Sequence, residues 1–151
     1  MTLELEPPKE RVTEGELKQF RGCPCFYSLT PNQFPLQVLV TEGVHYLIEK
    51  THCSWLIAEI VRLFIRGDNQ RIQHYRRKLR GLFFVVKFKA NNQADLICYY
   101  DEGDELERVH IPSTDLGTWV AMPELKLWVF PNRFPDKGTT VFWTFMLPSE
   151  Y

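Results

Sequence analysis

Apolar residues recur every three to four positions in the first half of the chain and every second position in the second half. The spacing of three to four is clearest over residues 41–69, "TEGVHYLIEKTHCSWLIAEIVRLFIRGDN", and is typical of a helix with a wide buried face. Thr41 is a suitable N-cap, and Gly67 is a suitable stop. We predict two helices with a break at "KTHC", the second capped by Thr51 or Ser54; the alternative is one bent helix.

A short helix is expected upstream of this region. Thr13 and Glu16 have the spacing of a capping box, and Gly22 is placed to end the helix. Residues 1–12 contain "EPPKE" and are predicted to form a mobile tail. Residues 23–37, "CPCFYSLTPNQFPLQ", contain three prolines and are predicted to form an irregular loop with aromatic anchors.

From Leu82 onward, apolar and polar residues alternate, which is typical of β-strands. Five strands are predicted, at residues 82–90, 94–101, 106–112, 124–130 and 141–148. The "NNQ" turn makes the first two a hairpin, and "PNRFPDKGTT" is predicted to be a loop before the last. Helices followed by strands predict one α+β domain over residues 13–151, with N-terminal helices packed on an antiparallel sheet of about five strands from the C-terminal half.

A basic segment lies between the helical and the strand patterns. If Asp68 caps a helix there, Ile72, Tyr75 and Leu79 share its apolar face and the basic residues lie outside. We favour a solvated face, with an acidic protein surface or a nucleic acid as the alternative partner. The nearby run "DEGDELE" and a net charge of −1 weigh against a nucleic-acid binder. The basic side chains are Arg71, Arg76, Arg77, Lys78 and Arg80.

The strand pattern also leaves large aromatic side chains on the wrong face for a sheet covered on one side only. Phe83, Trp128, Phe130 and also Trp143 alternate with the other apolar residues of their strands. A sheet that is apolar on both faces needs two covers. Helices supply one, and the other is either the loop at 23–34 or a partner chain. Exposed aromatic patches mark interfaces, so we expect partner binding at these aromatic and basic residues.

No motif for catalysis or metal binding is found. The spacing of Cys23 and Cys25 in "CPC" differs from that of a zinc knuckle, and Cys53 and Cys98 are expected to be buried apolar residues. The sequence has no G-x-S-x-G, no Gly-rich phosphate loop and no H-E-x-x-H. His45 and Glu49 are expected to form a surface pair. We therefore expect no enzymatic activity, cofactor or small-molecule substrate.

The sequence also bears on localisation. Its N-terminus lacks the apolar core of a secretory signal. The densest apolar run, "SWLIAEIVRLFI", is interrupted by Glu59 and Arg62 and is too short to cross a bilayer. We expect a cytoplasmic protein with reduced thiols that does not bind membranes.

Three segments resemble a known family. "TEGVHYLIEKTHCSWLI", the strand "ELKLWVF" and the end "LPSEY" are similar to the conserved blocks of a family of small uncharacterised bacterial, plasmid and phage proteins, a domain of unknown function. The resemblance covers residues 41–151; "RRKLRG" and "PNRFPDKG" depart from it. It implies a small one-domain cytoplasmic α+β protein and supplies no activity and no catalytic residues.

Taken together, the patterns favour a non-enzymatic protein-interaction module that binds a partner or associates with itself as a homodimer. The occurrence of the family on phages and plasmids suggests an inhibitor or accessory protein, for instance one that acts on a host defence complex. The alternative is a nucleic-acid-associated protein that uses residues 71–80. The terminal "SEY" is expected to be held against the body of the domain by Tyr151.

Overall fold

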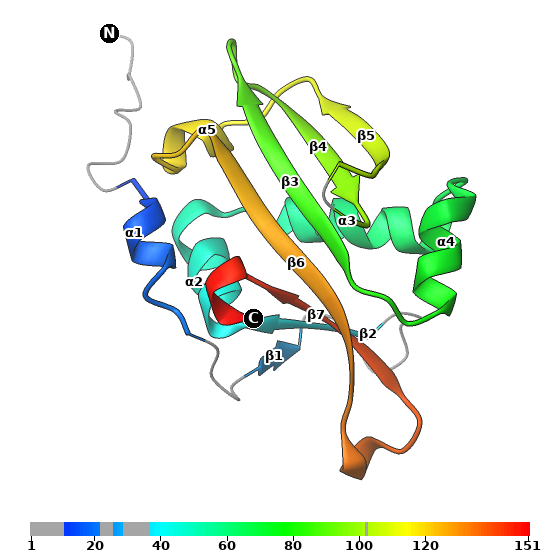
Figure 1. Cartoon of the computed structure of the whole chain (residues 1–151). Coiled ribbons are helices and arrows are strands. Elements are labelled where there is room, and N and C mark those ends of the chain that lie inside the picture. Colours follow the sequence, from blue (N-terminus) through cyan, green and yellow to red (C-terminus); the bar gives the residue numbers. More distant parts are fainter. Residues whose placement is uncertain (1–10, 22–25, 29–36, 102) are drawn as a thin grey trace, which may run out of the picture.

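The computed structural model describes residues 11–21, 26–28, 37–101 and 103–151, with only the backbone for 64–66. In these residues the chain forms one mixed sheet with helices (Figure 1). The helices are α1 (Glu14–Leu17), α2 (Glu42–Thr51), α3 (Ser54–Arg66), α4 (Gln70–Arg77) and α5 (Leu116–Trp119), with two 3-10 turns, η1 (Pro135–Lys137) and η2 (Pro148–Glu150). The strands are β1 (Phe26–Ser28), β2 (Gln37–Thr41), β3 (Leu82–Lys89), β4 (Gln93–Tyr99), β5 (Glu105–Ile111), β6 (Glu124–Arg133) and β7 (Val141–Met146).

The sheet of the described residues has seven strands in the order β1-β2-β7-β6-β3-β4-β5. All neighbours are antiparallel except β2 and β7, which are parallel. The predicted mixture of helices and sheet is thus confirmed, but the sheet is larger than about five strands and is not wholly antiparallel. The two additional strands precede α2, so the sheet is not formed by the C-terminal half alone.

Strand β2 was missed because it carries no alternation. Val38, Leu39 and Val40 are all buried, at 1%, 8% and 0% exposure. A parallel strand buried on both faces has a continuous apolar run instead of a period of two. In this chain the run also merges into the cap of the next helix, which hides it further.

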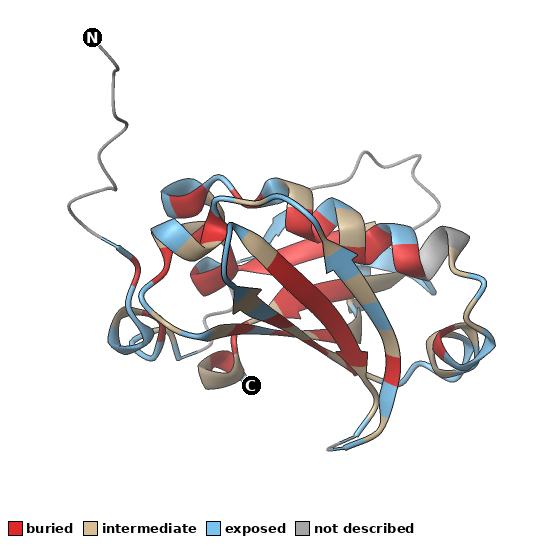
Figure 2. Ribbon diagram, turned by 90° about the horizontal axis from the view of Figure 1, so that it is seen from above, coloured by how far each residue is buried: buried red, intermediate tan, exposed pale blue. Residues whose placement is uncertain are grey.

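One apolar core joins the helices to one face of the sheet. Leu47 of α2 and Ile60 of α3 belong to the same buried cluster as Leu96 of β4 and Phe145 of β7. Figure 2 shows these helices along one side of the sheet. Buried positions alternate along β3 and β6, whereas residues 94–98 of β4 are all buried. The opposite face of β3, β4 and β6 carries no helix (Figures 1 and 2).

The predicted break between α2 and α3 is confirmed, but its caps differ from the prediction. Thr41 caps α2, and His52 ends it in the left-handed region at φ 56°. Helix α3 starts after Cys53 without a side-chain cap, and Gly67 ends it as predicted. Thr51 does not cap α3, because it is the last residue of α2, where its buried hydroxyl donates to the Leu47 carbonyl at 2.7 Å.

The start of the described chain is packed onto the connection before β6. Thr13 caps α1 as predicted, because its hydroxyl accepts from the Glu16 amide at 3.1 Å. The Glu16 carboxylate accepts from the Thr13 hydroxyl at 3.3 Å and not from the Thr13 amide, so only half of the capping box forms, and α1 ends at Leu17 and not at Gly22. Val12 is buried and forms a parallel bridge with Val120. Of the expected tail, residues 1–10 lie outside the described residues, while Arg11 and Val12 are held in place.

The hairpin of β6 and β7 is longer than predicted. Strand β6 continues through Pro131 to Arg133, so the first three residues of the predicted loop "PNRFPDKGTT" belong to a strand. In Figure 1 this hairpin projects beyond the rest of the sheet. The connection between β5 and β6 contains the short helix α5, which the sequence did not indicate.

The ring of Tyr151 packs against Trp128 and Phe130 of β6, and the carboxylate of Glu150 adds a second, buried anchor for the terminal segment. Glu150 is buried at 8% exposure. It accepts hydrogen bonds from the Thr41 hydroxyl at 2.6 Å and from the Gly43 amide at 3.1 Å, at the start of α2. A Cβ at Gly43 would meet side-chain atoms of Leu147 and Glu150 at under 3.0 Å, so a larger residue here would displace the carboxylate. A carboxylate is stabilised at the positive end of a helix dipole, which explains why Glu150 serves as the anchor.

No helix in the described part of the chain is both long and apolar enough to cross a membrane.

Candidate functional site

The uncovered face of β3, β4 and β6, here called the open face, consists of three rows of side chains. Strand register places Trp128, Phe83 and Tyr99 side by side in the first row. The second row contains Lys126, Val85 and Ile97, and the third contains Glu124, Lys87 and Asp95. Successive residues of a strand point to opposite faces, so alternation alone sets this arrangement.

Four rings form an aromatic cluster at one end of the open face. The cluster consists of Phe83, Trp128, Phe130 and Tyr151. Trp128 meets Phe83 at 5.2 Å between ring centroids and Tyr151 also at 5.2 Å, both near edge-to-face. Phe130 lies 5.8 Å from Phe83 and 5.1 Å from Tyr151. Tyr151 is 80% exposed, so the cluster is open to solvent on its outer side.

The rows enclose a shallow hollow of about 610 Å³. Its floor is apolar and includes Phe83, Val85 and Trp128. Charged side chains lie at both ends of the hollow, with Lys87, Lys126 and Glu124 at one end and Asp101 at the other. Lys126 also approaches Glu124 at 3.7 Å, an exposed pair that contributes little to stability.

The third row contains a buried carboxylate. The Asp95 side chain, 4% exposed, pairs with Lys89 at 2.7 Å, Arg108 at 3.2 Å and His110 at 3.0 Å. Hydrogen bonds from Lys89 and then from His110 lower the pKa of Asp95 to about 2. This corner of the face is therefore a folded-in ion cluster whose cations already have an anionic partner.

The predicted basic segment forms α4, but its cap and its face differ from the prediction. Asn69, not Asp68, is the N-cap, and its side chain accepts from the amides of Arg71 and Ile72 at 3.1 Å. Ile72 is buried as expected, whereas Leu79 lies beyond the end of the helix and is 39% exposed.

The five basic side chains of this segment do not act as one patch. Arg71 binds both oxygens of Asp104, at 2.6 and 2.8 Å, and Arg76 donates to Gln73 at 3.0 Å. The other three are exposed near the C-terminal end of α4, where the helix dipole favours positive charge. They are Arg77, Lys78 and Arg80.

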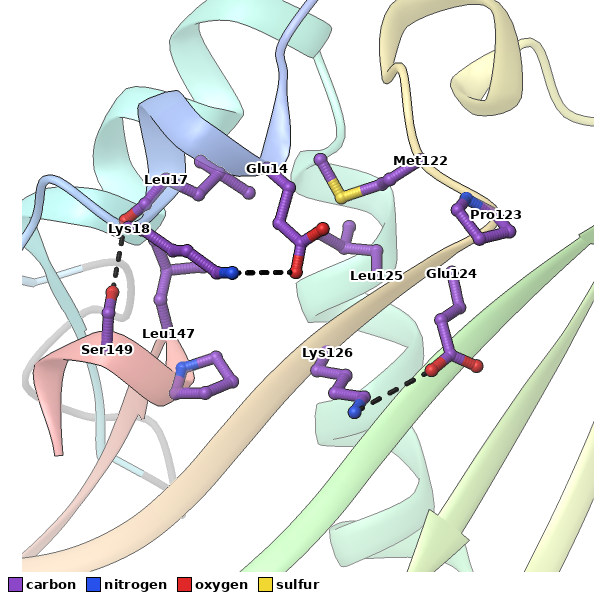
Figure 3. Close-up of a pocket in the computed structure, with 11 residues that line it drawn as sticks. Glu14, Leu17, Lys18, Met122, Pro123, Glu124, Leu125, Lys126, Leu147 and Ser149 are labelled. Carbon is purple, nitrogen blue, oxygen red and sulfur yellow. Dashed lines mark hydrogen bonds and ion pairs between the residues drawn. The ribbon is translucent and has the colours of Figure 1, made fainter.

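A second hollow, of about 460 Å³, lies between α1, η2 and the start of β6 (Figure 3). Leu17, Leu125 and Leu147 give it an apolar lining. Ion pairs lie at its rim, with Lys18 and Glu14 3.3 Å apart. It was not predicted because it joins segments that are distant in the sequence.

Several sequence predictions can now be placed. Phe83, Trp128 and Phe130 do come together, whereas Trp143 points into the core at 3% exposure and does not belong to the open face. Burial raises the pKa of the Cys53 and Cys98 thiols, which keeps them protonated and unreactive. The described residues contain no group of three or more His, Cys, Asp or Glu side chains suited to a metal.

Two more predictions concern single pairs. His45 and Glu49 form the expected surface pair at 3.6 Å. Cys23 and Cys25 lie outside the described residues.

The sequence patterns did not indicate Tyr99 and Tyr151 as members of the aromatic surface. Alternation within residues 94–101 was a signal for Tyr99, but nothing local indicated that Tyr151 returns to β6.

Residues 11–151 match the model of a family of unknown function (DUF6876). No curated protein and no solved structure matches the chain.

Proposed function

The chain belongs to that family of unknown function, so its role has to be inferred from its own surface, and we propose that it is a non-enzymatic module that binds a protein through the open face. The observation that carries this proposal is the aromatic cluster on a sheet face without a helix cover. Aromatic side chains at the centre of a patch, with charged residues around them, are the usual anatomy of a protein interface.

The charges around the centre favour a protein over a nucleic acid. Cations of the open face are matched by acids of the same face, as in the pairs of Lys89 with Asp95 and Lys126 with Glu124. Phosphate recognition requires an excess of basic side chains over one surface. A protein partner with an apolar centre and charges of both signs matches this rim better.

The alternative function, nucleic-acid binding, rests on Arg77, Lys78 and Arg80, for which no acidic partner is seen among the described residues. It predicts retention on a DNA column that falls steeply with salt and is lost in the triple charge reversal R77E/K78E/R80E. Our proposal predicts no such retention at about 150 mM salt.

The proposal is tested by affinity capture with the purified wild-type chain and the variants Trp128→Ala and Tyr27→Ala. Each captured protein is then purified, and calorimetry measures its affinity for each of these chains. The differently tagged wild-type chain is included as prey. We expect Trp128→Ala to weaken binding by about 30-fold, as for an interface hot spot. Tyr27→Ala is the matched control, because Tyr27 is 40% exposed but stacks on His45, away from the open face.

Equal affinity of the wild type and Trp128→Ala for every purified partner would contradict the proposal. Circular dichroism and thermal unfolding of each variant show whether its fold is intact. The resemblance to phage and plasmid proteins extends the proposal to a bacterial cytoplasmic inhibitor or accessory protein. In that case the partner is a host protein.

A further inference from the structure

We propose that the open face binds an acidic segment of its protein partner, which places an apolar side chain on the aromatic cluster and its carboxylates beside the C-terminal end of α4. This inference rests on the function proposed above, because it names the chemistry of the partner that the same face binds. It is carried by three exposed basic side chains, Arg77, Lys78 and Arg80, here called the basic rim.

The basic rim adjoins the aromatic cluster directly. Gly81 lies between Arg80 and the start of β3. A Cβ at Gly81 would lie 2.3 Å from the Phe130 ring, so the absence of a side chain lets the ring pack on the backbone here. Arg80 and Phe83 also line one hollow of about 280 Å³, which is next to the hollow of the open face because Phe83 and Asp101 line both. One partner segment can therefore contact the cluster and the basic rim together.

The cations of the basic rim differ from other cations nearby in having no partner. Lys89 and Arg108 are both paired with Asp95, and Arg71 is paired with Asp104. For the basic rim, no acidic partner is seen in the part of the chain that the structure describes. Its cations can thus pair with carboxylates of another protein without first breaking an ion pair of their own.

The surroundings of the basic rim favour acidic side chains of a protein over the phosphates of a nucleic acid. A nucleic-acid strand carries a charge at every nucleotide. Such a strand would have to cross acids, because Asp101 lines both hollows and Glu124 lies at the far end of the larger one. A protein segment can place a few carboxylates at the basic rim and apolar side chains elsewhere. Its apolar part then covers Trp128, a residue type that often dominates the binding energy of interfaces.

The two parts of this surface contribute differently to binding. Each exposed ion pair adds little affinity, so three contacts with the basic rim should strengthen binding about tenfold in total at about 150 mM salt. These contacts act mainly on the association rate and on its dependence on salt. The aromatic cluster fixes the position of the segment, because its rings bury apolar surface that the basic rim lacks.

Fluorescence anisotropy with synthetic peptides tests the inference. The probe is a labelled peptide with a Leu-Trp pair between two runs of glutamates, so that it can bind in either chain direction. We expect the wild-type chain to bind it with a Kd on the order of 100 µM, and R77E/K78E/R80E to bind it about tenfold more weakly. Trp128→Ala should also weaken its binding at least about tenfold, because the same segment contacts both parts of the surface.

The controls separate the basic rim from general electrostatic attraction. The matched variant K50E/R133E/K137E changes the net charge by the same amount at exposed positions on α2 and on the hairpin of β6 and β7, and it should bind the peptide as the wild type does. A peptide with lysines in place of the glutamates should not bind, and one with alanines in place of Leu-Trp should bind more weakly. Circular dichroism and thermal unfolding show that each variant is folded.

Three outcomes would overturn the inference. The first is no binding of the acidic peptide up to about 1 mM. The second is equal affinity of the wild type and R77E/K78E/R80E for it. The third is a single-stranded DNA of the same length that binds at least as tightly, which would assign the basic rim to a nucleic acid. A captured partner that depends on Trp128 but not on the basic rim would refute this inference alone and leave the proposed function standing.

Discussion

At the scale of single residues, the most constrained group of the open face is Asp95. Its carboxylate is enclosed by the cationic side chains of Lys89 and Arg108 and the ring of His110. These contacts lower its pKa from 3.8 to about 2, Lys89 having the largest effect. A carboxyl group with a lowered pKa in the folded state stabilises the fold above its unfolded pKa, and this stability is lost as the pH falls through the folded pKa.

We therefore predict that Asp95 contributes to acid unfolding between about pH 4 and pH 2. Asp95→Asn should cost about 1–3 kcal/mol at pH 7, because three polar side chains lose their anion. The same variant should lose less stability than the wild type as the pH falls from 4 to 2. Urea unfolding at a series of pH values measures both effects. Asp136→Asn, at an exposed turn, is the control; a parallel fall in Asp95→Asn and wild type would contradict the prediction.

At the scale of single residues, the alternation of side chains along the strands was sufficient to predict part of the open face. It selected Phe83, Trp128 and Phe130, because every second residue of a strand shares a face. It failed for Trp143, because an apolar residue in a strand of large apolar residues fits either face. It also gave no sign of Tyr151, whose place depends on the carboxylate of Glu150 binding to the start of α2.

At the scale of elements, the C-terminal end of α4 has a residue that does not suit its backbone. The amide of Arg80 bonds to the carbonyl of Tyr75, and the amide of Leu79 to that of Arg76, the pattern of a Schellman motif. Leu79 therefore has φ 55°, a conformation that favours glycine. The side chain is 39% exposed, so it contributes little packing in return.

We predict that Leu79→Gly stabilises the protein by about 0.5–1 kcal/mol, the relief of strain exceeding the added entropy of the unfolded chain. This corresponds to a rise in Tm of about 1–4 °C for a chain of this length. Lys78→Gly is the matched control, because Lys78 has φ −82° and glycine there should destabilise. Differential scanning calorimetry measures both, and an unchanged or lower Tm for Leu79→Gly would refute the prediction.

Helices with caps and strands with alternation were predictable at this scale, whereas elements set by tertiary contacts were not. All five strands predicted from Leu82 onward form; β3 and β6 follow the period of two, whereas β4 and β7 each have a run of consecutive buried residues. Strand β1 lies in a segment read as a loop, and it exists by pairing with β2. Strand β6 extends through Pro131 because β7 pairs with it there, and local propensity opposes this.

At the scale of the whole molecule, binding of a protein to the open face links stability to the concentration of that partner. A partner that binds only the folded state raises the Tm as its concentration increases. We predict a rise of about 3–6 °C for each tenfold increase in the concentration of a captured partner above the Kd. Trp128→Ala should need about 30-fold more partner for the same rise. Thermal melts over a hundredfold range of partner concentration measure this, and a wild-type Tm that does not respond to any captured partner would contradict binding to the folded chain.

The bond between Glu150 and the start of α2 has a consequence for how the chain is made. Glu150 is synthesised 107 residues after Gly43. In the same way, β2 can pair with its parallel neighbour β7 only after β7 has been synthesised. Contacts of such long sequence separation close late and slowly. The nascent chain therefore carries an unfinished helix cap and an unpaired strand edge until β7 and Glu150 have been synthesised.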